Sequence, residues 1–191
     1  MARVAALKDK VIKWDRRLDD PNAAKMCITI DGTDKKLWEK KHPSLPIDKG
    51  RFTKKHAHGG VKYQIALAVH FSQCVAIFGP CRGGEHDMTV LERSELLSKL
   101  KPGKLAIVDR GYIKLAHKHK LSWPNPYDSK EVNNFKSRAR LRHEAFNGRL
   151  AFFNILSATF RQSEKKHKLA FEAVAVTVQY QMDNGSPLWK V

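Results

Sequence analysis

Two short apolar segments, each closed by an aspartate beside a glycine, constrain the fold of this 191-residue chain more than any other feature. Residues 26–31 (MCITID) are rich in β-branched side chains and lead into Gly-Thr, and residues 104–109 (KLAIVD) lead to Gly111. Runs of this length that end at a turn signal are typical of buried strands. Ligand sites gather at the carboxyl ends of strands in open α/β sheets, so Asp31 and Asp109 are candidate site residues.

The rest of the chain alternates between helical and extended patterns. Residues 4–18 and 87–100 place apolar side chains at helical spacing, and residues 136–161 do so over a longer stretch. Residues 62–71 and 74–79 are two apolar runs separated by Ser-Gln, which predicts an antiparallel hairpin. The alternation predicts an α/β fold.

Three further segments give weaker signals. Residues 169–182 fit a helix by length and a strand by β-branched content, and we favour the helix. Residues 34–59 are polar and basic with several Pro and Gly, which predicts a long loop or a loose hairpin. Residues 113–135 form an irregular basic stretch. Long loops inside a compact domain are usually functional or mobile.

The charge of the chain is strongly basic and unevenly distributed. Lysine and arginine number 36 against 19 acidic residues, a formal net charge of +17. Residues 32–63 hold nine basic and three acidic side chains, and residues 110–143 hold nine and two. This concentration predicts an anionic partner, nucleic acid rather than a membrane surface, while a solvated basic face without a ligand stays open.

Several classes of protein are excluded by the same residues. No run approaches 18 apolar residues, which argues against a membrane-spanning helix. The first 25 residues have no apolar core of signal-peptide length, so secretion is unsupported. Three cysteines without C-x-x-C spacing argue against a disulfide framework or a zinc site.

Glu144, on the long helical segment, joins Asp31 and Asp109 as a third candidate carboxylate. Carboxylate oxygens suit Mg²⁺ or Mn²⁺ and leave coordination positions for phosphate oxygens. Two such ions about 4 Å apart stabilise the attacking and leaving oxygens of a phosphoryl displacement. Taken singly, each acid also has a plain structural interpretation: an aspartate caps a turn, and a glutamate pairs with a surface cation.

Five runs, in order along the chain, resemble the DDE transposase domain of the Harbinger type, a relative of bacterial insertion-sequence transposases. They are IDGTD at 30–34, KKHAHGGVKYQIALAV at 54–69, GGEHDMTVL at 83–91, IVDRGY at 107–112 and RLRHEAFNGRLAFFNIL at 140–156. The resemblance implies an RNase H-like fold, α/β, with a mixed five-stranded sheet flanked by helices. It places Asp31 on the first strand, Asp109 after the fourth and Glu144 on the following helix.

The resemblance also implies the activity. Asp31, Asp109 and Glu144 would be the catalytic triad, binding two Mg²⁺ or Mn²⁺ ions for hydrolysis and strand transfer on DNA. The alternative is a catalytically silent or domesticated DNA-binding or interaction module. His86-Asp87 matches the family's His-Asp pair, and Asp87 is equally suited to cap the following helix.

The expected domain organisation follows. Residues 1–25 form a helical remnant or linker, residues 26–162 the catalytic domain, and residues 163–191 a C-terminal extension on the same domain. Fewer than 30 residues precede the first catalytic strand, too few for the family's helix-turn-helix region, so we expect a fragment or a truncated copy. A separate DNA-binding partner protein would then recognise the DNA sequence. The oligomeric state stays open. If the host is eukaryotic we expect the protein in the nucleus, and otherwise in the cytoplasm.

Basic residues near the three acids are expected to contact the phosphate backbone of DNA, largely without sequence specificity. Lys62 has a second interpretation, in which it offsets the charge of the triad. The expected contacts are Lys54, Lys55, Lys62, Arg110, Arg138, Arg140 and Arg142.

Overall fold

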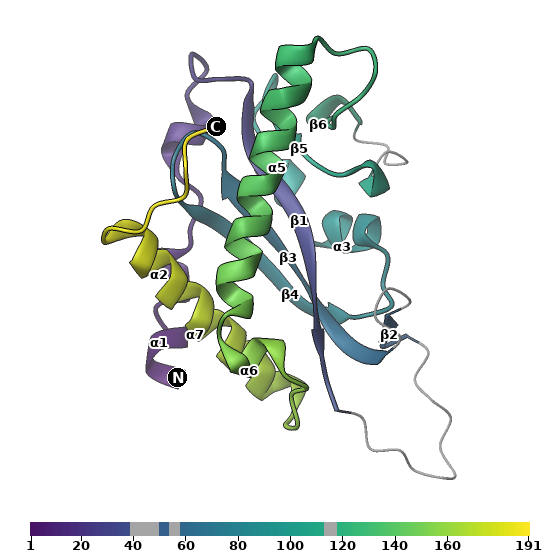
Figure 1. Ribbon diagram of the computed structural model, residues 1–191, viewed down its shortest axis with the longest axis vertical. Helices are drawn as coiled ribbons and strands as arrows, with labels where there is room; N and C mark the ends of the chain where they lie inside the picture. Colours follow the sequence, from purple (N-terminus) through teal and green to yellow (C-terminus); the bar gives the residue numbers. More distant parts are fainter. Residues whose placement is uncertain (39–49, 54–57, 113–117) are drawn as a thin grey trace.

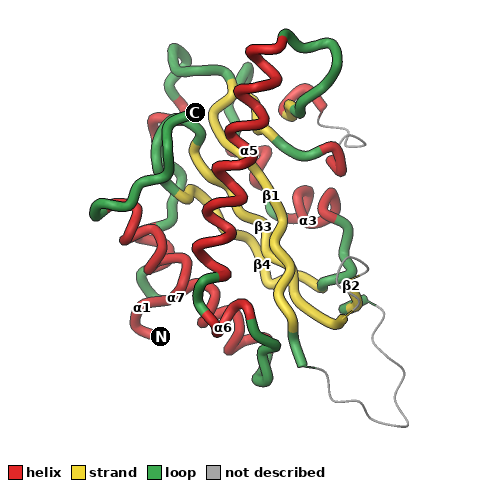
Figure 2. The backbone as a smooth tube through the Cα atoms, in the orientation of Figure 1, coloured by secondary structure: helices red, strands yellow, loops and turns green. Residues whose placement is uncertain are grey.

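The computed structural model describes residues 1–38, 50–53, 58–112 and 118–191. These residues form a mixed sheet with helices on both faces (Figures 1 and 2). The α/β class predicted from sequence is confirmed. The strands are β1 (Met26–Lys36), β2 (Phe52–Thr53), β3 (His58–Ala68), β4 (Cys74–Arg82), β5 (Leu105–Ile107) and β6 (Leu121–Ser122).

The strand order is β2-β3-β1-β5-β6, and β4 also pairs with β3, on the edge opposite β1. Strands β1, β3 and β4 are antiparallel neighbours, whereas β1, β5 and β6 are parallel. The predicted hairpin is therefore confirmed as β3–β4. The sheet has six strands rather than five, because the two-residue β2 pairs with the beginning of β3.

Alternating side chains of strand β3 contribute to two of the three apolar clusters among the described residues. Tyr63 and Ile65 face the cluster that contains helices α5 and α7, whereas Ala66 and Ala68 face the cluster that contains α3 and α4. On the first face lie α5 (Lys130–Ala151), α6 (Asn154–Ser157) and α7 (Glu164–Asp183), and on the second α3 (Asp87–Arg93) and α4 (Leu96–Lys99).

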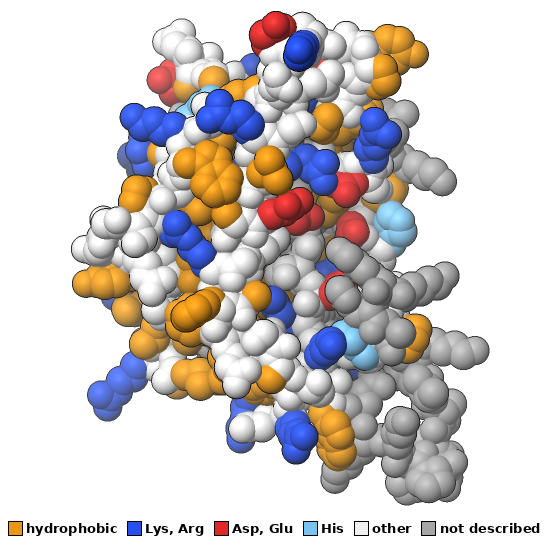
Figure 3. All heavy atoms as spheres, in the orientation of Figure 1, with side chains coloured by type: hydrophobic (Ala, Val, Ile, Leu, Met, Phe, Trp, Pro, Cys, Tyr) orange, Lys and Arg blue, Asp and Glu red, His pale blue; other side chains and the backbone are white. Residues whose placement is uncertain are grey.

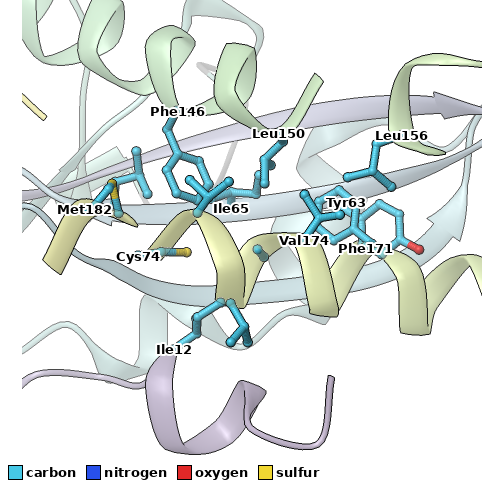
Figure 4. Packing of buried hydrophobic residues seen from close by; sticks show 14 of the residues in the cluster. Ile12, Tyr63, Ile65, Cys74, Phe146, Leu150, Leu156, Phe171, Val174 and Met182 are labelled. Carbon is cyan, nitrogen blue, oxygen red and sulfur yellow. The ribbon is translucent and has the colours of Figure 1, made fainter. Parts of the chain in front are cut away.

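Figure 4 shows how distant parts of the chain meet in the first cluster. Tyr63 stacks on Phe171 of α7, with ring centroids 3.7 Å apart, and Phe146 projects from α5 into the same cluster. Ile12, from the N-terminal segment, packs from the other side of α7. Both ends of the chain thus contribute to the core that supports the sheet.

The N-terminal segment is not the single helix that residues 4–18 predict. It forms α1 (Ala2–Ala5), α2 (Lys8–Val11) and a 3₁₀ turn (Arg16–Asp19), and α1 and α2 pack on α7. Ile12 adopts an extended backbone at the end of α2, and this break brings its side chain into the core.

The remaining helices differ from prediction mainly at their boundaries. The helix expected over 87–100 is divided at Glu95, which has a left-handed backbone with φ of 52°. The helix expected over 136–161 begins earlier, at Lys130, because the Ser129 hydroxyl accepts a hydrogen bond from the Val132 N–H. It also ends earlier, at Ala151, and the short α6 follows. The favoured helix at 169–182 is confirmed as α7. Among the helices of the described residues, none combines the length and the apolar character that crossing a membrane requires.

Candidate active site

Asp31 and Asp109 lie at the same level of two adjacent parallel strands. The last paired residues of β1 and β5 are Thr29 and Ile107. Asp31 follows Thr29 by two positions, and Asp109 follows Ile107 by two positions. Asp31 lies inside β1 rather than at its end, which corrects the sequence prediction. The strand continues because its antiparallel pairing with β3 extends to Lys36, after the parallel pairing has stopped.

Glu144 completes this group from the side of α5. The helix crosses β1 (Figure 1), and one pocket is lined by side chains of β1, β5 and α5. The pocket is narrow, about 10 Å³, which is roughly the space of one water molecule. Its lining residues are Thr29, Ile30, Asp31, Ile107, Asp109, Arg140, His143 and Glu144. The three carboxylates expected to act together therefore line one pocket.

The surroundings of Asp31 in this pocket disfavour its charged form. The pKa of Asp31 is raised to about 6, chiefly because the carboxyl group is buried. The carboxylates of Asp87 and Asp109 add to the effect, whereas the Gly32 N–H and the Arg140 guanidinium oppose it. A buried carboxyl group beside other carboxylates is stabilised in its charged form by any cation that enters the pocket.

Arg140 is a cation of this kind. Its Nη2 lies 3.7 Å from Asp109 Oδ2, and the Gly111 N–H donates to Asp109 Oδ1. Figure 3 shows acidic side chains gathered between basic ones on the face of the molecule that carries α5.

The oxygen ligands fit Mg²⁺ or Mn²⁺ by their chemistry, since both ions prefer carboxylates. Within residues 1–38, 50–53, 58–112 and 118–191, no group of three or more His, Cys, Asp or Glu side chains is close enough to hold a metal ion. The carboxylates thus share a pocket without forming a preassembled coordination shell.

Two residues that the sequence analysis did not select join α5 to β1. Asn147 Nδ2 donates to Asp31 Oδ2 at 3.2 Å, and His143 Nδ1 lies 2.8 Å from Thr29 Oγ1. Burial, together with Arg142 and Arg140, lowers the pKa of His143 to about 3, so its ring is neutral at physiological pH. Their signal in the sequence is the helical spacing, because residue 147 lies one helical turn after residues 143 and 144.

Lys62 belongs to the interior of the site rather than to the DNA-facing surface. Its Nζ donates to Asp87 Oδ1 at 2.7 Å and to the Glu85 carbonyl at 2.8 Å, and only 8% of the residue is exposed. The buried ammonium group is therefore not available to a phosphate, and its ion pairs are with Asp87 and Asp34 rather than with a residue of the triad. The cap of α3 is His86, whose Nδ1 accepts from the Met88 N–H, and not Asp87.

Arg142 is also buried, with 2% of the residue exposed. Its guanidinium donates to the carbonyl oxygens of Ala68, Phe71 and Trp189, so it is not available to a phosphate. The predicted phosphate contact of Arg142 is wrong, because the local sequence around a helical arginine does not show whether its side chain points outward or inward.

The other expected DNA contacts fall into two groups. Arg110 and Arg138 are exposed and Arg140 is half-buried at the pocket, so these three side chains remain accessible. Lys54 and Lys55 lie outside the described residues.

Comparison with known proteins adds one finding to this geometry. A family model described as DDE superfamily endonuclease matches residues 30–179, which include Asp31, Asp109 and Glu144. No curated protein and no solved structure matches the chain. Because the match covers well over half of the 191 residues, the chain belongs to the DDE superfamily endonucleases.

Proposed function

We propose that this chain is the catalytic domain of a DDE transposase of the Harbinger type, a divalent-metal-dependent nuclease that cuts DNA and transfers its strands. The observation that carries the proposal is the convergence of Asp31, Asp109 and Glu144 on one pocket. These acids are 78 and 35 positions apart in the chain, and they come from strand β1, the segment directly after β5 and the crossing helix α5. Independent surface acids have no reason to converge in this way.

The topology supports an RNase H-like fold. Three antiparallel strands, β4, β3 and β1, are followed across the sheet by the parallel strands β5 and β6, with helices on both faces. In this arrangement the first aspartate lies on the central strand β1 and the second follows its parallel neighbour. This placement on β1, after β5 and on α5 supports Asp31, Asp109 and Glu144 as the proposed metal ligands.

Asp31, Asp109 and Glu144 would hold two Mg²⁺ or Mn²⁺ ions through their carboxylate oxygens. When bound, such ions supply positive charge that stabilises the attacking and leaving oxygens of a phosphodiester. Arg140 is suited to bind an adjacent phosphate, because its ion pair with Asp109 is long and partly solvated and therefore weak. The buried cation Lys62 holds Asp87 beside the pocket, so that this fourth carboxylate is partly neutralised.

The partner that we propose is DNA, contacted mainly through its phosphates. Arg110, Arg138 and Arg140 are the accessible candidates of the second basic segment, and such contacts position a duplex without reading its sequence. Sequence recognition would then come from a separate DNA-binding protein.

A second candidate function is a transposase-derived module that binds DNA without cleaving it. One observation favours it: in the described part of the chain the acids do not form a group close enough to hold an ion. The two functions differ in metal-dependent cleavage, which a single assay measures.

The test is nicking of supercoiled plasmid DNA in Mn²⁺. We expect the wild type to nick in Mn²⁺ and not in excess chelator, and Glu144→Gln and Asp109→Asn to reduce nicking to background. Glu92→Gln is the matched control, since it makes the same acid-to-amide change at an exposed position of α3 and should nick at the wild-type rate. Nicking in chelator, or unchanged nicking by Glu144→Gln, would contradict the proposal. DNA binding without any nicking would favour the second candidate.

A further inference from the structure

Helix α5 is fastened to β1 by two side-chain hydrogen bonds on either side of Glu144. His143 meets Thr29 at 2.8 Å, and Asn147 donates to Asp31 at 3.2 Å. Thr29 and Asp31 are two residues apart on a strand, so they point to the same side of the sheet. His143 and Asn147 are four residues apart on a helix, so they lie on the same face. The pair of bonds sets the position of α5 along β1, and thereby that of Glu144 relative to Asp31.

Of these two bonds, only that of Asn147 involves a proposed catalytic carboxylate. The carboxamide nitrogen contacts Asp31 Oδ2, while the carboxamide oxygen is buried and has no hydrogen-bond partner among the described residues. An unpaired buried acceptor destabilises a fold, and asparagine is a poorer helix former than alanine. The stability of α5 therefore gives no reason for asparagine at position 147, whereas its contact with Asp31 does.

That contact adds a side-chain donor to the Gly32 N–H, which also meets the Asp31 carboxyl group. The terminal torsion of aspartate is broad, so a carboxylate without a fixed partner samples many orientations. A donor that holds one oxygen also determines where the other oxygen points. Groups that orient a metal ligand from behind typically change metal affinity or activity by 10- to 100-fold when they are removed.

We infer that Asn147 is a positioning residue of the DDE site, which holds the Asp31 carboxylate in the orientation that binds a divalent ion. This inference rests on the proposed function. Asn147 does not line the pocket itself, so it acts through Asp31 rather than by touching DNA or the reacting atoms.

The first measurement is Mn²⁺ binding to the protein without DNA, from the loss of the free Mn²⁺ electron paramagnetic resonance signal. We expect Asn147→Ala to weaken binding by about 10- to 100-fold, because Asp31 loses its orienting donor. Asn134→Ala is the matched control: it removes an exposed asparagine from the same helix and should bind Mn²⁺ like the wild type. Without metal, the melting temperature of Asn147→Ala should be no lower than that of Asn134→Ala.

The second measurement is plasmid nicking across a range of Mn²⁺ concentrations. For Asn147→Ala we expect a lower kcat at low Mn²⁺, an unchanged KM for DNA, and recovery of kcat as Mn²⁺ is raised. A purely structural role would give a loss that added metal does not restore.

The outcomes separate this inference from the proposed function. Equal Mn²⁺ binding by the wild type and Asn147→Ala, with wild-type binding abolished by Asp109→Asn, would overturn the inference and leave the function standing. Asn147→Ala melting well below Asn134→Ala without metal would also overturn the inference, since the asparagine would then serve the fold. A wild type that neither binds Mn²⁺ nor nicks would overturn the proposed function and the inference with it.

Discussion

His167 lies in the interior of the molecule as a neutral hydrogen-bond partner. Its Nδ1 is 2.8 Å from the Tyr63 hydroxyl, and only 1% of the residue is exposed. Burial, with Lys35 nearby, lowers the pKa of His167 to about 4. In the unfolded chain the ordinary histidine value of about 6.5 applies. The unfolded state therefore binds more protons than the folded state between these two values.

This difference predicts a stability that falls as the pH is lowered from 6.5 to 4. His167→Gln keeps a hydrogen-bond partner for Tyr63 but does not titrate. Going from pH 7 to pH 5, we expect its free energy of unfolding in urea to fall about 1 to 2 kcal/mol less than that of the wild type. The range from pH 7 to pH 8 is the control, because it lies above both pKa values. There the free energies of unfolding of the two proteins should change in parallel. Parallel curves over the acidic range as well would contradict the prediction.

At the scale of elements, α5 organises both the site and the fold. One side of the helix carries Arg140 and Glu144 to the pocket, while Arg142 reaches into the interior. Burial lowers the pKa of Arg142 to about 10, so the guanidinium stays charged at neutral pH. Its bonds to Ala68, Phe71 and Trp189 join the β3–β4 turn and the C-terminal segment to the helix.

Removing this junction should destabilise the whole protein. Arg142→Met leaves three carbonyl groups without their donor, and we expect the free energy of unfolding to fall by about 3 kcal/mol or more. Arg138→Met is the matched control, because Arg138 is an exposed arginine of the same helix that donates to the Lys190 carbonyl. Urea denaturation of both variants measures the free energy of unfolding. Equal losses in the two variants would show that the buried Arg142 guanidinium contributes no more stability than the exposed Arg138.

At the scale of the whole molecule, the excess of positive charge determines how the chain meets DNA. Each phosphate neutralised by a basic side chain releases counterions, so the logarithm of the binding constant falls with the logarithm of salt by about 0.9 per contact. Arg110 lies directly after Asp109 and is exposed. Lys101 is also exposed, but it precedes β5 at the strand end opposite Asp109.

The salt dependence therefore identifies which charges face DNA. For Arg110→Ala we expect the slope of the double-logarithmic plot to become shallower by about 0.9, measured by fluorescence anisotropy with a labelled duplex. Lys101→Ala removes the same charge from the molecule and should leave the slope unchanged. Equal slopes for the wild type and Arg110→Ala would show that Arg110 does not contact the DNA phosphates.

Much of the architecture could be predicted from local patterns. The strand at 26–31, the hairpin of β3 and β4 and the helix α7 all follow from which side chains alternate or recur over a few residues. The strand–turn–glycine pattern also selected Asp31 and Asp109. Periodicity succeeds here because burial of one face of a strand or helix is decided by neighbours two to four positions away.

The α/β class, the basic character and three candidate carboxylates follow from the amino-acid sequence without any knowledge of the fold. The tertiary structure alone decided which polar side chains point inward and what they touch. Arg142 bonds Ala68 across 74 residues, and Asn147 bonds Asp31 across 116. No local pattern distinguishes these residues from exposed neighbours of the same type. Their partners are chosen by the packing of α5 against β1 and the β3–β4 turn, because a buried polar group must find its hydrogen bonds wherever the fold places a complementary atom.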